Sequence, residues 1–260
     1  MIPKIIHYCW LSDEPYPEDL KQCMSTWKEK LPDYEFVLWN FERFDKASSP
    51  WVSQAFDNKK YAFAADYIRL YAVYNYGGIY MDMDIEVLKP FDELLDSNLM
   101  LAYEDEERTG IEAGCFGAEK GNHVIGECLN YYAGRSFIKS DGSFDTLPLP
   151  RIMMQPVSRY PELKIRDRYS FTCKSYKTGI ITIKADSYTV HHFAGSWVSE
   201  YEKQLQNQIQ KIYAKYGENG LARFLVVLTG IKKRLGYFGI KATVQHYIDK
   251  YIRRKNVGKI

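Results

Sequence analysis

The sequence predicts an α/β fold, because short apolar runs alternate with amphipathic segments from the start of the chain. Residues 4–10 and 34–39 are typical of buried strands. Residues 18–30 and 51–58 have the spacing of amphipathic helices. A longer helical segment, 61–76, is followed at once by two glycines and another apolar strand. Strands and helices in this order are typical of a sheet with helices packed against it.

The helical segment 61–76 carries a charged pair among small neighbours. At about 100° per residue, Asp66 and Arg69 lie on the same face of the helix. Gly77 and Gly78 predict the helix end, because glycine adopts the left-handed conformation of a helix C-cap at no steric cost. We expect Asp66 and Arg69 to serve a site, and the alternative is an ordinary surface ion pair.

Alternation of apolar and polar residues predicts one strand over residues 79–87. Asp82 and Asp84 then face the same way, about 6.5–7 Å apart. Two carboxylates at this separation converge on one divalent cation, because hard cations prefer oxygen ligands. The sequence therefore predicts an Asp-x-Asp metal site. The alternative is an amphipathic edge strand whose acidic face is solvated.

The rest of the α/β region gives weaker signals. Strands are expected at residues 98–103, 111–118, 178–184 and 188–192, and helices near residues 94–95 and at 123–132. Residues 134–150 show no periodicity, so we expect a long loop, and such loops in compact domains are usually functional or mobile. Gln155 is a candidate for the catalytic face. Trp10 follows the first predicted strand, where α/β sheets bind ligands, although ordinary core packing would also explain it.

The segment 191–197, HHFAGSW, contains the second candidate metal ligand. Imidazole is a good ligand of Mn²⁺, so a histidine here would complete a site with two aspartates. The alternative is a histidine that only satisfies hydrogen bonds in the core.

Several stretches resemble glycosyltransferase family 32, the sugar-binding DxD group that includes bacterial capsule-type transferases and yeast mannosyltransferases. The resemblance rests on IPKIIHYCWLSDEPYP, STWKEKLPDYEFVLWN, KKYAFAADYIRLYAVYNYGGIYMDMDIEVLKP and HHFAGSW. It covers roughly residues 1–200 and implies a GT-A fold, a Rossmann-like mixed sheet flanked by helices. The chain is also more distantly similar to the catalytic domains of clostridial glucosylating toxins and to family 8 galactosyltransferases.

The resemblance also implies roles for individual residues. Asp82 and Asp84 would bind Mn²⁺ or Mg²⁺ together with His192, which is favoured over His191 because His192 and Gly195 are similar to the HxxG segment of family 8. Trp10 would stack on uracil, and Trp197 would close over the diphosphate. The implied donor-binding residues are His7, Tyr8, Trp10, Ala62, Asp66, Arg69, Gly78, Asp82, Met83, Ser196 and Trp197. The implied catalytic residues are Asp66, Arg69, Asp82, Asp84 and Gln155.

The resemblance implies an enzyme that transfers a hexose from a nucleotide sugar with retention of anomeric configuration. We expect UDP-galactose or UDP-glucose as donor and a growing surface glycan, such as a lipid-linked oligosaccharide, as acceptor. GDP-mannose is the alternative donor, and a non-catalytic carbohydrate- or nucleotide-binding protein is the alternative class. A DxD phosphohydrolase is disfavoured, because Ile85 and Glu86 replace the usual residues after its second aspartate.

The charge distribution separates residues 1–200 from a basic extension, 201–260. The extension has 13 Lys and Arg against three acidic residues, whereas residues 1–200 have 22 against 30. Its apolar runs predict basic amphipathic helices on an anionic membrane surface, and the alternative is a solvated basic face. No aromatic platform supports binding to nucleic acid.

Composition is consistent with a chain of 260 residues that buries a sizeable core. Its five cysteines form no CxxC pair, which favours reduced thiols. No apolar run approaches the roughly 18 residues of a membrane span. We therefore expect a cytoplasmic protein, peripheral on the inner face of the cytoplasmic membrane.

Overall fold

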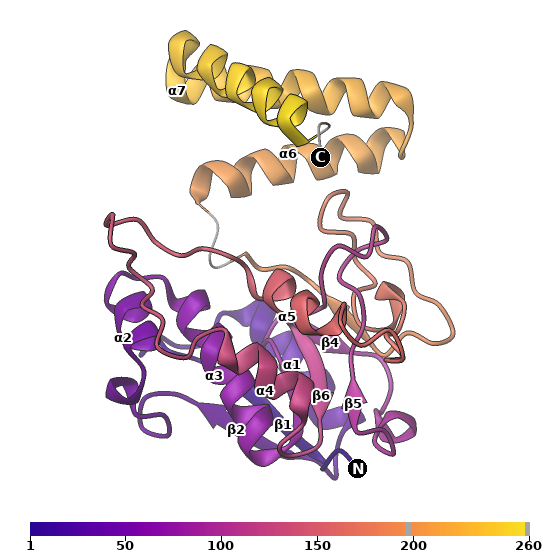
Figure 1. Ribbon diagram of the computed structural model, residues 1–260. Coiled ribbons are helices and arrows are strands. Elements are labelled where there is room, and N and C mark those ends of the chain that lie inside the picture. Colours follow the sequence, from indigo (N-terminus) through magenta and orange to yellow (C-terminus); the bar gives the residue numbers. More distant parts are fainter. Residues whose placement is uncertain (196–198, 258–260) are drawn as a thin grey trace. The chain divides into compact units, whose positions relative to one another are not determined.

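The computed structural model describes residues 1–195 and 199–257, with side chains as far as residue 249 (Figure 1). The described chain divides into two compact units. The first comprises residues 1–174 and 181–195, and the second comprises residues 175–180 and 199–257.

A five-stranded mixed sheet forms the centre of the first unit. Its strands, in spatial order, are β2 (Glu35–Trp39), β1 (Ile5–Cys9), β3 (Gly78–Met81), β6 (Cys115–Ala118) and β5 (Leu99–Met100). Strand β1 is parallel to both of its neighbours, whereas β6 is antiparallel to β3 and β5. The carboxyl ends of β1 and β3 therefore meet at the same edge of the sheet.

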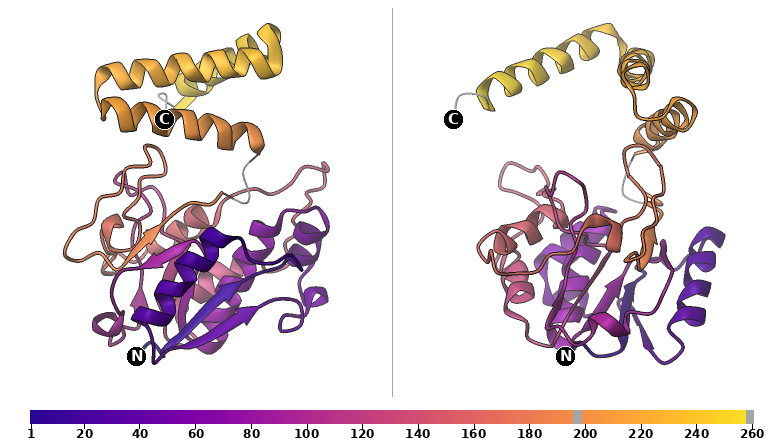
Figure 2. Two further views of the ribbon diagram at one scale, coloured as in Figure 1. Left: turned by 180° about the vertical axis from the view of Figure 1, so that it is seen from behind. Right: turned by 90° about the vertical axis from the view of Figure 1, so that its right-hand side faces the viewer.

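Helices cover both faces of this sheet (Figure 2). The helices of the unit are α1 (Glu18–Lys30), α2 (Pro50–Asp57), α3 (Tyr61–Tyr76), α4 (His123–Asn130) and α5 (Leu149–Val157), with short 3-10 helices η1 (Lys46–Ser48), η2 (Asp92–Leu94) and η3 (Arg168–Ser170). On one face, Tyr80 of β3 packs with residues of α2 to α5. On the other face, Ile79 and Met81 pack with Trp27 of α1. This arrangement confirms the predicted GT-A-like α/β fold, a mixed sheet flanked by helices.

The predicted strand over residues 79–87 is instead two strands of different sheets. After β3, the chain makes a turn and enters β4 (Ile85–Val87), which pairs antiparallel with β7 (Thr189–His191). Met83 and Ile85 keep the predicted alternation, since both are buried. Alternation of buried side chains therefore continued through a turn that periodicity alone does not reveal.

Other predicted elements also differ in extent. The strand expected at 98–103 is only two residues long, because Ala102 and Tyr103 make isolated bridges with other segments. Residues 178–184 form no strand and contain one bridge, between Lys174 and Ile181. The segment around Gln155 forms helix α5, in which Pro148 and Pro150 occupy the N-terminal boundary that proline favours.

The second unit consists mainly of α6 (Glu200–Tyr216) and α7 (Gly220–Val257). Ser199 and Glu202 form a capping box that fixes the start of α6. Helix α7 is interrupted at Gly239, whose φ of 76° lies in the left-handed region. Along the described part of the chain, none of the helices combines the length and the apolar character needed to cross a bilayer.

Candidate active site

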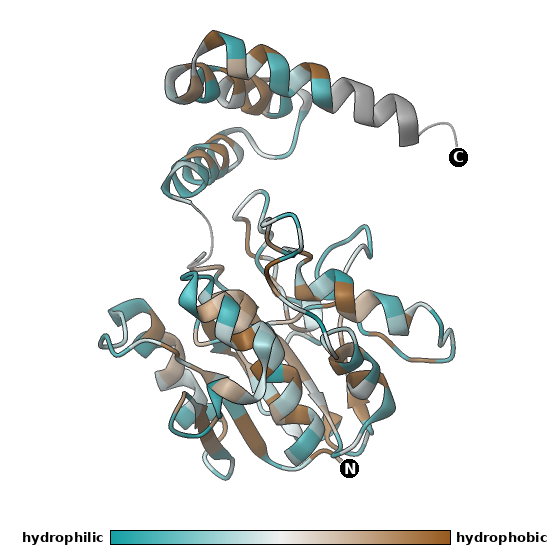
Figure 3. Ribbon diagram, turned by 60° about the vertical axis from the view of Figure 1, so that its left-hand side comes forward, coloured by the Kyte–Doolittle hydropathy of each residue, from teal (hydrophilic) through white to brown (hydrophobic). Residues whose placement is uncertain are grey.

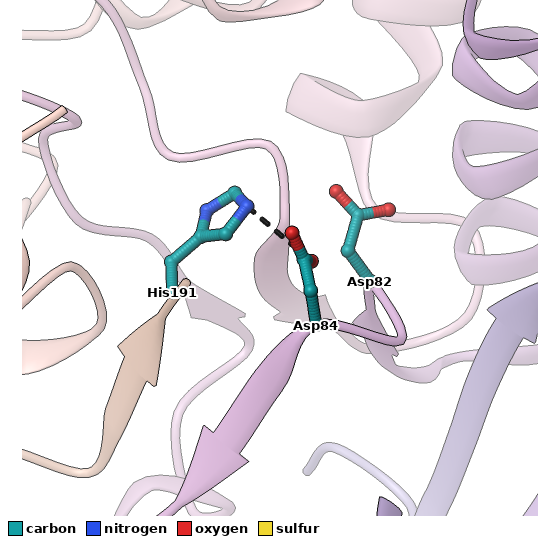
Figure 4. Close-up of side chains that lie close together, drawn as sticks. All are labelled: Asp82, Asp84 and His191. Atoms are coloured by element: carbon teal, nitrogen blue, oxygen red, sulfur yellow. Dashed lines mark ion pairs between the residues drawn. The ribbon is translucent and has the colours of Figure 1, made fainter. Parts of the chain in front are cut away.

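Asp82 and Asp84 flank the turn between β3 and β4, directly after the carboxyl end of β3. The Asp82 N–H donates to the carbonyl of Gly114 at 2.8 Å, and the Asp82 carbonyl accepts from the N–H of Ile85 at 3.1 Å. Met83, between the two aspartates, is buried in the core. Both carboxylates consequently point the same way, as Figure 4 shows, although a turn and not a strand presents them.

His191, the last residue of β7, faces these carboxylates (Figure 4). Its Nε2 atom lies 3.5 Å from Oδ1 of Asp84. One ligand atom from each of Asp82, Asp84 and His191 lies within 4.8 Å of the others. Two carboxylates and an imidazole are ligands that suit a divalent cation such as Mn²⁺. The residues present therefore fit the metal site that the sequence predicted.

The histidine that the structure brings to the aspartates is His191, whereas the sequence analysis favoured His192. His191 pairs with Ile85 across β4 and β7, and successive strand residues point to opposite sides. The His192 ring accordingly lies elsewhere, with Nε2 2.8 Å from Oε2 of Glu86. The HxxG spacing could not resolve this choice, because it does not reveal the turn at Met83 and Asp84 that brings the Asp84 carboxylate to His191.

The two aspartates differ in their electrostatic surroundings. Burial alone would raise the pKa of Asp84, but the neighbouring His191 and a 2.7 Å hydrogen bond from the Ala194 N–H lower it to about 2. Loss of solvation raises the pKa of Asp82, and the Arg69 guanidinium opposes that rise. Asp84 is therefore the more firmly ionised carboxylate at neutral pH.

Glu112 is a buried carboxylate behind His191 that the sequence analysis did not identify. It accepts hydrogen bonds from the Gly114 N–H at 2.6 Å and from the Thr172 hydroxyl, and Oε1 lies 3.1 Å from Nδ1 of His191. Burial would raise its pKa, but His191 and these donors lower it. The two carboxylates, Glu112 and Asp84, in turn raise the pKa of His191 well above its ordinary value despite the opposing effect of burial.

Arg69 of α3 is buried beneath Asp82 and joins several elements. Its guanidinium lies 3.4 Å from Asp66 and 3.3 Å from Asp82, and it donates to the Ala113 carbonyl at 2.8 Å. It also stacks over the Tyr80 ring, whose hydroxyl donates to Asp82 at 2.8 Å. Arg69 therefore positions Asp82. Its predicted contact with the sugar stays a prediction.

Asp66 lies beside Arg69 and is the single acidic residue of α3. Burial raises its pKa to about 6, even though Arg69 and a hydrogen bond from the backbone of Leu149 act in the opposite direction. Ala62 lies one helical turn earlier on the same face and is partly buried. These positions are compatible with the predicted donor contacts, which stay predictions.

The residues expected to hold the nucleotide base lie at the end of β1. Trp10 directly follows β1 and is partly exposed, and its indole N–H donates to the Glu14 carbonyl at 3.0 Å. Because β1 and β3 are adjacent parallel strands, Trp10 and Asp82 follow strand ends at one edge. Tyr8 packs edge-on against Trp27 at 5.7 Å between ring centroids.

Other predicted donor or catalytic residues lie away from the aspartate pair. His7 is buried, with Nε2 2.8 Å from the Gly77 carbonyl, and its backbone lies between two paired strands. Gly78 starts β3 at the opposite end from Asp82, where an added Cβ would meet the Ile5 carbonyl at 2.7 Å. Close packing, rather than donor contact, explains glycine there.

Three further predicted residues complete the comparison. Met83 is a core residue, so only its backbone is available to a donor. Gln155 lies on the exposed side of α5, in a surface hollow that it shares with Glu127 and Arg159, and not with the aspartate pair. Ser196 and Trp197 lie outside the described residues, so their predicted roles stay predictions.

Part of the chain is similar in sequence to known glycosyltransferases. Residues 17–101 match the family described as "Glycosyltransferase sugar-binding region containing DXD motif". The chain is 38% identical over 98 residues to inositol phosphoceramide mannosyltransferase 3 of Schizosaccharomyces pombe, an alignment that covers 36% of this chain and 27% of that protein. It is 36% identical over 99 residues to mannosyl phosphorylinositol ceramide synthase SUR1 of Saccharomyces cerevisiae, which covers 36% of this chain and 26% of the relative.

A third relative is the initiation-specific alpha-1,6-mannosyltransferase of Candida albicans, 29% identical over 122 residues, or 43% of this chain and 31% of that protein. Among solved structures, the PaToxG glycosyltransferase has a TM-score of 0.46 and 21% identity, and the match covers 62% of this chain and 70% of that one. The sequence relatives are fungal mannosyltransferases, so the capsule type of the stated resemblance is not supported.

The family match includes both aspartates of the candidate metal site and the Asp66–Arg69 pair. It supports the stated resemblance and the prediction of a glycosyltransferase, without specifying the donor or the acceptor. Residues 17–101 therefore match the sugar-binding region of the DXD-motif glycosyltransferases.

Proposed function

We propose that the protein is a metal-dependent glycosyltransferase that moves a hexose from a nucleotide sugar to a hydroxyl-bearing acceptor. The observation that carries this proposal is the convergence of Asp82, Asp84 and His191 at the end of β3. Both aspartates lie inside the matched DXD region, residues 17–101. GDP-mannose is the favoured donor, because the relatives are named mannosyltransferases. UDP-glucose and UDP-galactose are the second candidates.

The residues of the site have different proposed roles. Asp82, Asp84 and His191 would hold a divalent cation, with Mn²⁺ favoured and Mg²⁺ second. When bound there, the cation stabilises the negative charge of the departing nucleoside diphosphate. Arg69 keeps the Asp82 carboxylate in place from below. Asp66, whose pKa is about 6, is largely ionised at neutral pH and accepts hydrogen bonds from hydroxyls of the hexose.

Retention of anomeric configuration is part of the proposal. Asp82 and Asp84 are engaged with Arg69, Tyr80 and His191, which disfavours either carboxylate as a covalent nucleophile. The acceptor hydroxyl then attacks the anomeric carbon from the same face as the leaving group. An oxygen of the departing phosphate accepts the proton of that hydroxyl. Detection of a glycosyl–enzyme adduct would contradict this step.

The acceptor that the relatives suggest is a polar lipid. Two of them are named for inositol phosphoceramide or its mannosylated product, so a lipid headgroup with several hydroxyls is favoured here. A glycan on a lipid carrier is the second candidate.

The test is nucleoside diphosphate release from GDP-mannose, UDP-glucose and UDP-galactose, each with Mn²⁺ and again with a chelator. We expect chelator-sensitive release from GDP-mannose that falls at least about 100-fold in Asp84→Asn, since metal-held charge stabilisation contributes several kcal/mol. Asp186→Asn, at an exposed aspartate outside the site, is the matched control. Absence of both turnover and binding for all three nucleotide sugars would refute the proposal.

A further inference from the structure

Helix α7 presents an apolar stripe on its surface before the break at Gly239. The residues of this α7 stripe are exposed by 39–59% and are Leu221, Phe224, Val227, Leu228 and Leu235. Their spacing of three, four and seven residues places them on one side of the helix. Figure 3 shows hydrophobic residues repeating along α7. Such a continuous apolar stripe on an exposed helix indicates a binding surface.

Packing within the second unit uses the opposite side of α7. Ala222 is fully buried, and Lys233, three turns further along the same face, donates to Gln204 of α6 at 2.9 Å. Tyr237 packs against Tyr201 of α6 at 4.9 Å between ring centroids. Since α6 occupies this face, the α7 stripe is a second apolar surface that α6 does not cover.

An apolar hollow extends the α7 stripe past the break in the helix. The hollow has a volume of about 550 Å³ and is lined by Ile231, Leu235, Thr243, Val244, Tyr247 and Ile248. Its lining offers almost no polar partner, so a hydrocarbon chain fits it better than a polar ligand does.

Basic residues flank the α7 stripe on both sides. By helical geometry, Lys232 lies at one edge, and Arg223 and Arg234 lie at the other. An apolar stripe between basic edges is typical of helices that lie in the interface of an anionic membrane.

We propose that the α7 stripe binds the surface of an anionic lipid bilayer, with acyl chains against the apolar residues and lipid phosphates at the basic edges. A second copy of the chain is the other candidate occupant. Residues 201–260 carry 13 basic and three acidic residues, so two copies joined here would bring strongly like-charged surfaces together. Charge complementarity therefore favours the anionic membrane, independently of the transfer reaction.

The experiment is flotation of the full-length chain with vesicles of phosphatidylcholine, with and without phosphatidylglycerol. We expect binding to the mixed vesicles and at least about tenfold weaker partition for Phe224→Ser/Leu228→Ser, since each loses buried apolar area. The matched control is Ile181→Ser/Ile183→Ser, two exposed apolar residues outside the helices, which leaves partition unchanged. Circular dichroism shows whether each variant keeps its helices.

A charge variant tests the other half of the proposal. Lys232→Gln/Arg234→Gln is expected to weaken partition to the mixed vesicles about 25-fold, at roughly fivefold per basic residue near the surface. Equal binding of the wild type to both kinds of vesicle, or binding to neither, overturns the proposal. So does a wild type that sediments as a dimer and becomes monomeric in Phe224→Ser/Leu228→Ser while vesicle binding persists.

Discussion

The Glu112 carboxylate lies 3.1 Å from Nδ1 of His191 and leaves the opposite nitrogen of the imidazole facing Asp84. Glu112 precedes β6 of the central sheet, whereas His191 ends β7 of the small sheet. The contact therefore couples the two sheets at the point where the candidate metal ligands converge. A carboxylate behind a metal-binding histidine fixes the ring orientation and makes the ligand more basic.

Replacing Glu112 should weaken the metal site without removing a ligand. For Glu112→Gln we expect 10- to 100-fold weaker Mn²⁺ binding, about the usual effect of losing such a partner, with activity recovered at high Mn²⁺. Calorimetric titration with Mn²⁺ measures this directly. Glu86→Gln is the matched control, since Glu86 contacts Nε2 of the neighbouring His192, which is not one of the converging ligands. Unchanged Mn²⁺ affinity in Glu112→Gln would contradict the positioning role.

A methyl group at Gly114 should disturb the same arrangement. A Cβ there would lie 2.7 Å from Cε1 of His191 and 2.8 Å from Oε1 of Glu112. Gly114→Ala is therefore expected to lower transfer at least about tenfold, because the added methyl group would push His191 and Glu112 out of position, and small displacements near a reacting centre are costly. The comparison is Gly230→Ala in α7, where an added Cβ meets nothing within 4 Å and transfer should not change.

The sequence predicted the framework well where local rules determine it. The bounds of α1 and α3 agree with the predicted helices, since apolar spacing and the glycines after Tyr76 act locally. The Asp66–Arg69 pair was likewise visible, because both residues lie on one helix face. These features need no knowledge of distant contacts.

The parts that were missed depend on pairing between distant segments. The turn at Met83 keeps the alternation of a strand, so only the pairing of β4 with β7 reveals the break. The same turn brings the Asp84 carboxylate to His191, whereas His192 contacts Glu86 on the other side of the strand pair. Glu112 carries no motif, and its role appears only when β7 lies beside it. The one signal in the sequence was an acidic residue between Gly110 and Gly114.

Arg69 should contribute strongly to stability as well as to the site. Arg69→Met leaves the Asp66 and Asp82 carboxylates close together without a cation, so we expect the free energy of unfolding to fall by about 3–5 kcal/mol. Urea denaturation measures this. Arg159→Met, which removes the exposed ion pair with Glu127, should cost less than about 1 kcal/mol. Similar small losses in both variants would contradict a buried hub at Arg69.

Asp66 should trade stability for function. Its pKa of about 6 in the folded chain exceeds the ordinary 3.8, so the folded state holds the proton longer than the unfolded state does. Stability from this group is therefore present at low pH and is lost as the pH rises from about 4 to about 6. At pH 7, Asp66→Asn should abolish transfer and raise the unfolding free energy by up to about 3 kcal/mol.

Thermal unfolding of Asp66→Asn and the wild type at several pH values checks this expectation. The stabilisation should be visible at neutral pH and disappear in acid, where the wild-type carboxyl is already protonated. A variant that is less stable than the wild type at pH 7 would show that the ionised carboxylate stabilises the fold, contrary to the shift described here.

The most direct test of the metal-dependent site is the Mn²⁺ dependence of nucleoside diphosphate release in the wild type, His191→Ala and His192→Ala. The two histidines are adjacent in sequence, but only His191 converges with Asp82 and Asp84. We expect His191→Ala to require at least about tenfold more Mn²⁺ and His192→Ala to behave like the wild type. A large effect in His192→Ala with none in His191→Ala would contradict the site described here.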